Sequence, residues 1–487
     1  MSSTAQPVSR TAVHASLKGR AVALLVIAAL GLGFMWAADH DDQRCVQLVL
    51  LVLLAPFMLA RAGIADQIAW MGRTGRWLLG AFFGLGAFST VGAFSPRHAL
   101  YEWTMLLFLL LAAALLAAEL ARAGDSGLQF VLRGVVFIGI LYSLRVALMY
   151  AAMLASGAPP DMHAMFVGFS NARFFNHAQT ALLPMAVLLY LQAPKGSAWR
   201  RAAFALSAVW WTFLFVSQSR ATMLALGIGC MLVLAVRRGQ ARSFLRAVVL
   251  SALAGATIYV LAFVVLPMLA GMPSFDTVNI AMQRTAADPT SGRLPLWELA
   301  GQLMAAHPWL GIGPQHYAHE ESMVKWAAHP HNFLLQIGAE WGLPTLLCLL
   351  AAIVIGMRGL VRSSRRIAPA DSAAQQTLTV LLATGTAILV DGLFSGVIVM
   401  PQSQMAIVLY LACAAGWMRS LDKDLAPRAG ALLHWLSKGL AVAALCGLAY
   451  AVAPNIERHA VHAPLTPVEQ ARNPGIHWPR LWEAGHF

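Results

Sequence analysis

Residues 104–120 read TMLLFLLLAAALLAAEL and contain one charged side chain, Glu119. An apolar run of about this length is what a helix needs to cross the ~30 Å hydrocarbon core of a bilayer. Inside lipid every backbone polar group must be satisfied within the protein, and a helix satisfies its own. The run therefore predicts a transmembrane helix.

Runs of the same kind recur from one end of the chain to the other, and 59% of all residues are hydrophobic while 11% are charged. The mean hydropathy of +0.67 is far above that of a soluble domain. We expect all-α architecture: an integral membrane protein with a polytopic bundle of 12–13 transmembrane helices, 12 if one of the short runs does not cross. The 13 candidate spans are residues 21–38, 46–60, 77–95, 104–120, 135–156, 179–193, 202–217, 221–236, 247–270, 333–357, 377–400, 405–418 and 438–454.

One long interval, residues 271–332, is too polar to cross a membrane and carries Arg293 with several histidines. Within it, residues 294–306 have apolar side chains at helical spacing, which predicts a partly helical loop. The sequence therefore divides into residues 1–270 with the N-terminal transmembrane helices, the loop 271–332, residues 333–454 with the C-terminal transmembrane helices, and a short tail, 455–487. The Trp and Arg content of the tail is typical of an interfacial segment.

Basic residues indicate the orientation of the bundle. With a cytoplasmic N-terminus, seven connections on one side hold 23 of the 34 Lys and Arg residues, whereas 13 of the 15 histidines fall in spans or on the other side. This follows the positive-inside rule, so the long loop faces outward. The net charge of +13 is spread over short loops, which favours a lipid bilayer as partner and argues against nucleic acid.

Two arginines at expected span or helix starts, Arg220 and Arg293, allow two interpretations. Each is either an interfacial anchor whose head group reaches the lipid surface, or part of a clamp for a diphosphate. A guanidinium stays charged and donates two parallel hydrogen bonds to phosphate oxygens, so a pair can neutralise a leaving diphosphate.

His331, at the end of the loop, also allows two interpretations. It either caps or packs against the next helix, or its imidazole acts as general base for a sugar hydroxyl. A third hypothesis is a metal site, because four histidines lie close together in this part of the sequence. These four are His316, His319, His329 and His331. No Cys or carboxylate completes a known ligand spacing, so we expect neither a metal nor another cofactor.

Other polar residues are second-tier candidates. Arg145 and Asp391 lie in expected spans, where charges are costly unless paired, and we expect them either to pair with each other or to contact substrate. Glu340 either orients a polar network or stabilises the start of a helix. Arg173, in the loop-like segment 157–180, is a candidate third contact to phosphate or sugar.

The order of three motifs resembles the O-antigen ligase/polymerase superfamily. These are Ser291-Gly292-Arg293, the segment 307–313 (HPWLGIG), and the segment 331–344 (HNFLLQIGAEWGLP), with the matching motifs covering about residues 215–350. The resemblance implies a glycosyltransferase that uses a polyprenyl-diphosphate-linked glycan as donor and needs no metal. It also implies that Arg220 and Arg293 are the essential arginines and that His331 is the catalytic histidine, with Asn332 of the same motif as a further candidate.

Within this superfamily the acceptor distinguishes three reactions. The short C-terminal tail favours an O-antigen ligase, which transfers undecaprenyl-diphosphate-linked O-antigen to lipid A-core at the periplasmic face of the bacterial inner membrane, with inversion at the anomeric carbon. An O-antigen polymerase and a protein O-oligosaccharyltransferase remain open. From another class, a transporter of lipid-linked glycans also remains, although a carrier needs polar sites reachable from both sides.

Overall fold

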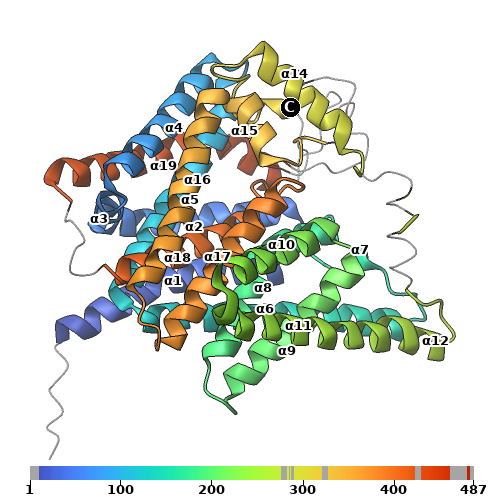
Figure 1. Ribbon diagram of the computed structural model, residues 1–487. Helices are drawn as coiled ribbons and strands as arrows, with labels where there is room; N and C mark the ends of the chain where they lie inside the picture. The colour runs from blue at the N-terminus through green and yellow to red at the C-terminus, as the bar shows by residue number, and fades with distance from the viewer. Residues whose placement is uncertain are drawn as a thin grey trace, which may run out of the picture.

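The computed structural model describes residues 10–275, 282–283, 286, 290–320, 327–422, 429–460 and 480–482, and the side chains among them from residue 20 onward except those of 458–460. The described part of the chain is 82% helical and contains no strand. The prediction of an all-α, multi-pass membrane protein is therefore confirmed (Figure 1).

The helices before the long loop follow one another through short connections. In chain order they are α1 (Arg10–Met35), α2 (His40–Ala60), α3 (Gly63–Trp70), α4 (Gly72–Gly92), α5 (Pro96–Ala123), α6 (Asp125–Ala155), α7 (Met162–Met165), α8 (Ala172–Gln192), α9 (Ala198–Ser217) and α10 (Arg220–Arg237). A 3-10 turn, η1 (Arg238–Ala241), leads into α11 (Arg242–Tyr259), a π-helical stretch η2 (Val260–Val265) and α12 (Leu266–Leu269).

The helices from the loop onward begin with α14, which covers the helix predicted for residues 294–306. They are α14 (Arg293–Ala306), the 3-10 turn η3 (His316–Ala318), α15 (Phe333–Trp341), α16 (Leu343–Ser363), the 3-10 turn η4 (Ser364–Arg366), α17 (Ser372–Gly392), α18 (Pro401–Ser420) and α19 (Ala431–Ala460). In Figure 1, α14 and α15 lie together at one end of the molecule, beside the ends of α4 and α16.

Eight helical stretches among the described residues are long and apolar enough to cross a membrane. Nine of the 13 predicted spans fall within them, because one stretch, Arg220–Leu269, holds two. The other four predicted spans are helical but do not reach that length and hydropathy: they are the apolar part of α1, Arg20–Met35, and α4, α9 and α18. All 13 predicted spans therefore coincide with helices, and nine of them meet these limits of length and composition.

Two segments differ from the sequence prediction. Residues 333–357 form two helices instead of one, because Gly342 adopts a left-handed φ of +87° and is followed by a proline at the start of α16. The segment 157–180 is not a loop throughout, since α8 already begins at Ala172. Asn171 starts that helix by accepting a hydrogen bond from the backbone N–H of Arg173 at 3.0 Å.

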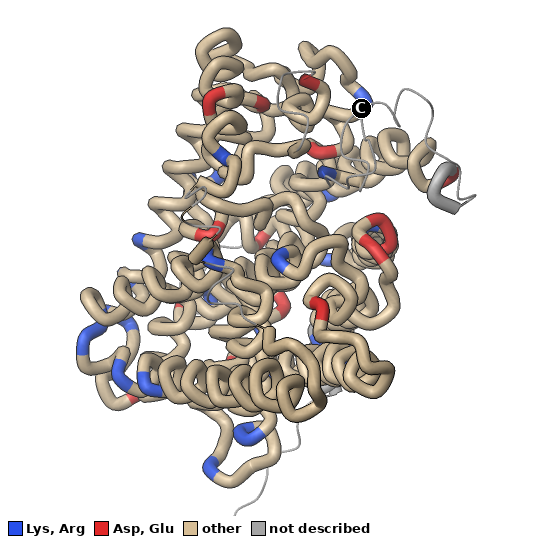
Figure 2. The backbone as a smooth tube through the Cα atoms, turned by 90° about the vertical axis from the view of Figure 1, so that its right-hand side faces the viewer, with Lys and Arg blue, Asp and Glu red and all other residues tan. Residues whose placement is uncertain are grey.

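The centre of the bundle is formed by α5 and α8, whose apolar windows are largely buried inside the protein. α5 packs against α18 and α19, and α8 packs against α9, α17 and α18. Helices α11 and α16 lie outside and expose large apolar side chains such as Leu253 and Leu347, as expected for surfaces that face lipid. Figure 2 shows basic residues gathered toward the lower end of the molecule in that view.

Candidate functional site

Arg220 and the Ser291-Gly292-Arg293 turn lie in contact. α9 ends at Ser217, the chain turns through a left-handed Gln218 (φ +53°), and Arg220 becomes the first residue of α10. Its guanidinium Nη2 donates a hydrogen bond to the Ser291 hydroxyl. The structure thus brings together two turns that are 71 residues apart in the sequence.

Arg293 is positioned by its own turn. Ser291 and Gly292 both have positive φ, +55° and +76°, and this sharp reversal makes Arg293 the first residue of α14. Its side chain donates to the carbonyl of Thr290 at 3.3 Å. Two half-buried arginines therefore stand at the starts of α10 and α14, where the helix dipole also favours an anion.

The His329-Pro330-His331 turn is attached to the same helix. Trp297, one helical turn after Arg293, donates from its indole Nε1 to the Pro330 carbonyl at 3.0 Å. His331 has a left-handed φ of +51°, its backbone N–H donates to His329 Nδ1 at 3.2 Å, and the two imidazole rings are 4.1 Å apart between centroids. Because α14 begins with Arg293 and its Trp297 binds this turn, the helix fixes the positions of Arg293 and His331 relative to each other.

Burial, together with smaller effects of the positive charge of Arg293 and of His177, lowers the pKa of His331 to about 3. Burial also holds the pKa of His329 well below its usual value, with His331 and Arg480 adding to the effect. Both rings are therefore neutral near pH 7, and a neutral imidazole is able to accept a proton.

The segment 307–313 forms backbone hydrogen bonds with the C-terminal end of α15. The backbone N–H groups of Ile312 and Gly313 donate to the carbonyls of Ala339 and Glu340 at 3.0 and 2.9 Å. Gly311 has a φ of +69°, and a Cβ there would lie 2.4 Å from the backbone carbon of Glu340. The glycines of this motif are thus required for the loop to approach the helix end closely.

Asn332 is the N-cap of α15. Its side-chain oxygen accepts hydrogen bonds from the backbone N–H groups of Leu334 and Leu335 at 3.0 and 3.2 Å. The asparagine therefore has a structural reason to follow His331, because it starts the helix directly after the candidate base.

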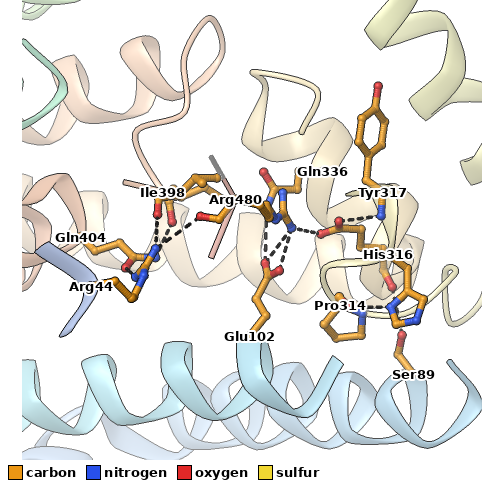
Figure 3. A network of polar contacts seen from close by, with 12 residues as sticks. Arg44, Ser89, Glu102, Pro314, His316, Tyr317, Gln336, Ile398, Gln404 and Arg480 are labelled. Atoms are coloured by element: carbon orange, nitrogen blue, oxygen red, sulfur yellow. Dashed lines mark hydrogen bonds and ion pairs between the residues drawn. The ribbon is translucent and has the colours of Figure 1, made fainter. Parts of the chain in front are cut away.

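Glu340 belongs to a polar network and does not stabilise a helix start, since it lies at the end of α15. Its carboxylate is fully buried, accepts from the backbone N–H of Tyr317 at 3.0 Å and pairs with Arg480. Arg480 also pairs with Glu102 at 2.7 Å (Figure 3). The described tail residues, 480–482, are thus buried in the body of the protein rather than lying at the membrane interface as the sequence suggested.

Arg145 and Asp391 do not pair. The guanidinium of Arg145 donates to the Phe34 carbonyl at 2.7 Å. Asp391 is fully buried and accepts from the Thr180 hydroxyl at 2.6 Å, and its carboxylate lies 3.8 Å from His177 Nδ1. The prediction that the two charges neutralise each other is wrong, because hydropathy places both in the membrane without telling which helices adjoin.

The four histidines of the metal hypothesis separate into two pairs. The rings of His316 and His319 are 6.1 Å apart, and both nitrogens of His316 are engaged: Nδ1–H donates to the Pro314 carbonyl, and Nε2 accepts from the backbone N–H of Ser95. His329 and His331 form the other pair. Among the residues with described positions, no group of three His, Cys, Asp or Glu side chains is arranged to hold a metal ion.

Residues 202–350 match the family model described as O-antigen ligase. The match supports membership of the O-antigen ligase/polymerase superfamily. The match runs from α9 into α16 and so includes Arg220, Arg293 and His331. No curated protein matches the chain.

Two features of the site lie outside the part that matches the superfamily. Arg173 and His177 are four residues apart in the first turns of α8 and so share a face of that helix. His177 is absent from the candidates predicted from sequence, although its spacing from Arg173 was a local signal. Its approach to Asp391, on α17, had no signal in the sequence.

Proposed function

We propose that the protein is an O-antigen ligase, a glycosyltransferase that moves undecaprenyl-diphosphate-linked O-antigen polysaccharide onto lipid A-core. The observation that carries the proposal is the contact of Arg220 with the Ser291-Gly292-Arg293 turn, which brings two arginines together at the start of α14, the helix whose Trp297 holds the turn of His331. Membership of the superfamily supports glycosyl transfer of this general kind.

The chemistry assigns a role to each of the three residues. The donor's diphosphate lies between Arg220 and Arg293, whose forked donors suit phosphate oxygens and neutralise the charge that develops there. His331 removes the proton from the acceptor hydroxyl as its oxygen attacks the anomeric carbon. The bond from that carbon to the diphosphate breaks, the electron pair leaves with the diphosphate, and attack from the opposite face inverts the centre.

Both substrates are lipids, so the bilayer confines them to the plane in which the site lies, which supplies much of the proximity that transfer needs. In this proposal the site faces the periplasm from the inner membrane. The concentration of Lys and Arg in the seven opposite connections supports that orientation. No metal step is required, because the two arginines carry the positive charge.

Purified protein in detergent, given undecaprenyl-diphosphate-linked O-antigen and lipid A-core, tests the proposal. We expect transfer in the presence of EDTA, its loss in His331→Ala, and its retention in His163→Ala, which removes an exposed histidine outside the site. Wild-type transfer by His331→Ala contradicts the base assignment.

The same assay separates the alternatives. Transfer to a second lipid-linked donor but not to lipid A-core identifies a polymerase, and transfer to a protein acceptor identifies a protein O-oligosaccharyltransferase. Because detergent leaves no second compartment, any transfer excludes a protein that only transports the lipid-linked glycan.

A further inference from the structure

A cavity of about 510 Å³ lies among the ends of four helices and has no role in the mechanism above. Its lining comes from the first turns of α6 and α17 and from the last turns of α8 and α18. The other end of α17, at Asp391, contacts Thr222 close to Arg220, so the cavity and the proposed transfer site lie at opposite ends of this helix. In the orientation proposed above, the cavity is therefore on the cytoplasmic side. Its volume is in the range of sites that bind small molecules.

Hydrogen bonds between side chains fix one wall of the cavity. Gln129 of α6 donates from Nε2 to Gln192 Oε1 of α8 at 2.6 Å, and Gln192 Nε2 donates to the Thr377 hydroxyl of α17 at 2.8 Å. The three residues line the cavity and join three of its four helices. The cavity is thus a feature of the packed bundle, with a polar wall where the helices meet.

The lining carries charges of both signs. Asp125, Arg133 and Asp371 all line the cavity and are exposed, and among the described residues none of them makes an ion pair. Asp371 caps α17 by accepting from the backbone N–H of Ala374 at 3.0 Å, and Asp125 stands in the first turn of α6. Stabilising a helix start explains the place of each carboxylate on its helix, but not that a guanidinium lines the same cavity.

Arg133 also begins an exposed apolar stripe along α6. Phe137, Leu144 and Leu148 follow it at helical spacing on the same face and are 55%, 55% and 71% exposed. α6 is long and apolar enough to cross a membrane, and exposed apolar side chains on such a helix face lipid. Arg133 therefore stands where the cavity meets the lipid-facing surface.

We propose that this cavity binds the head group of a zwitterionic phospholipid, phosphatidylethanolamine, whose acyl chains lie along the stripe on α6. The forked donors of Arg133 bind the phosphate oxygens, and the ammonium group donates to the carboxylates of Asp125 and Asp371. The lipid bound in this way joins the ends of four helices. This inference goes beyond the proposed glycosyl transfer and does not depend on it.

Charge complementarity distinguishes this head group from other common ones. An anionic head group such as that of phosphatidylglycerol can bind Arg133, but it brings no cation to the two carboxylates and is repelled by them. A choline head group brings a cation but has no N–H to donate. Phosphoethanolamine combines a phosphate with a hydrogen-bonding ammonium, so it matches all three charged residues.

Native mass spectrometry of the detergent-solubilised full-length protein, titrated with phosphatidylethanolamine, phosphatidylcholine or phosphatidylglycerol, tests the proposal. We expect wild type to bind phosphatidylethanolamine with a Kd about tenfold below that for the other two, the effect of hydrogen bonds to charged groups. Asp125→Asn combined with Asp371→Asn should abolish this preference, and asparagine keeps the N-cap of α17. Arg133→Gln should weaken binding of phosphatidylethanolamine about tenfold.

Two matched variants serve as controls. Asp161→Asn changes another N-cap carboxylate, that of α7, which accepts from the backbone N–H of His163 at 3.0 Å and lies outside the cavity. Arg358→Gln changes an exposed arginine of α16, also outside the cavity. Both should keep the wild-type preference. Phosphatidylethanolamine should also raise the Tm of wild type and of both controls, but not that of the double variant.

Several outcomes overturn the proposal. Equal Kd values of wild type for phosphatidylethanolamine and phosphatidylglycerol do so, as does a double variant that keeps the wild-type preference. If the double variant does not fold, Arg133→Gln decides, and unchanged binding of phosphatidylethanolamine by it overturns the proposal. Water-soluble glycerophosphoethanolamine that binds as tightly as the lipid overturns the assignment to a phospholipid.

Discussion

The cluster of Arg220, Arg293 and His331 and the network around Arg480 both contain arginines, but these arginines differ in how deeply they are buried. Arg480 is 1% exposed and lies between the carboxylates of Glu102 and Glu340. Arg220 and Arg293 are half-buried, and they contact a serine hydroxyl and a backbone carbonyl. The positive charge of Arg480 is compensated inside the network by these two carboxylates.

The network around Arg480 has a structural role, whereas the cluster is the proposed binding site. In the network, Arg480 joins α5 to the end of α15, and the same Glu340 receives the backbone N–H of Tyr317 from the loop. The described tail residues also connect this network to α2, because Arg44 of α2 donates to the Leu481 carbonyl at 2.9 Å. The network therefore holds α15 in place from one end, while the cluster at its other end presents His331.

The largest effect expected is on transfer, in the double variant Arg220→Ala with Arg293→Ala. Each arginine is expected to contribute about 10²–10³-fold, as for other groups that stabilise developing charge, so the double variant should show no measurable transfer. Its Tm should remain close to that of the wild type, because the network around Arg480, and not the cluster, holds the helices together. A large loss of Tm in the double variant, with transfer restored at low temperature, would show that the cluster stabilises the fold as the network does.

Arg480→Ala should act mainly on stability. It leaves two carboxylates buried without their partner, and breaking a buried pair in this way costs about 3–5 kcal/mol. Thermal unfolding in detergent measures the loss. Combining Arg480→Ala with Glu102→Gln and Glu340→Gln should recover much of it, and Arg358→Ala, at a basic side chain on lipid-facing α16, serves as control.

Acid should weaken the loop. The pKa of His331 is lowered to about 3 in the folded protein and that of His329 is lowered as well, so as the pH falls below 6.5 the unfolded chain binds protons that the folded protein does not. The folded state loses no stability by this effect above pH 6.5 and loses more as the pH falls, by on the order of 1 kcal/mol for His331 at pH 5. The pH dependence of Tm should flatten in His331→Ala; an unchanged slope would contradict the argument.

The smallest effect expected is at the helix start between the two regions. Asn332→Ala removes the N-cap of α15 and should cost about 1 kcal/mol, whereas Asn332→Asp keeps the cap and should cost much less. Transfer should fall only as far as His331 is displaced. A loss of transfer by Asn332→Asp as large as that of His331→Ala would indicate that Asn332 itself meets the substrate.

Much of the site was visible in the sequence because its signals are local. The turns that place Arg220 and Arg293 are short polar interruptions between apolar runs, and Asn332 follows His331 directly. The contact of Arg220 with Ser291 confirms that the two turns meet, although their roles in transfer remain proposals. The tail was misjudged: Arg and Trp are typical of an interface, but Arg480 and Trp482 are buried.

By itself the sequence determined that this protein is a helical membrane protein. The hydropathy of a segment is the sum over its own residues, and a helix forms its backbone hydrogen bonds within itself. Only the tertiary structure decided which buried charges meet: Asp391 with His177 and not with Arg145, and Arg480 with Glu102 and Glu340. The reason is physical. Pairing in a low-dielectric interior depends on distance in space, and helices with similar apolar faces leave their neighbours unspecified until they pack.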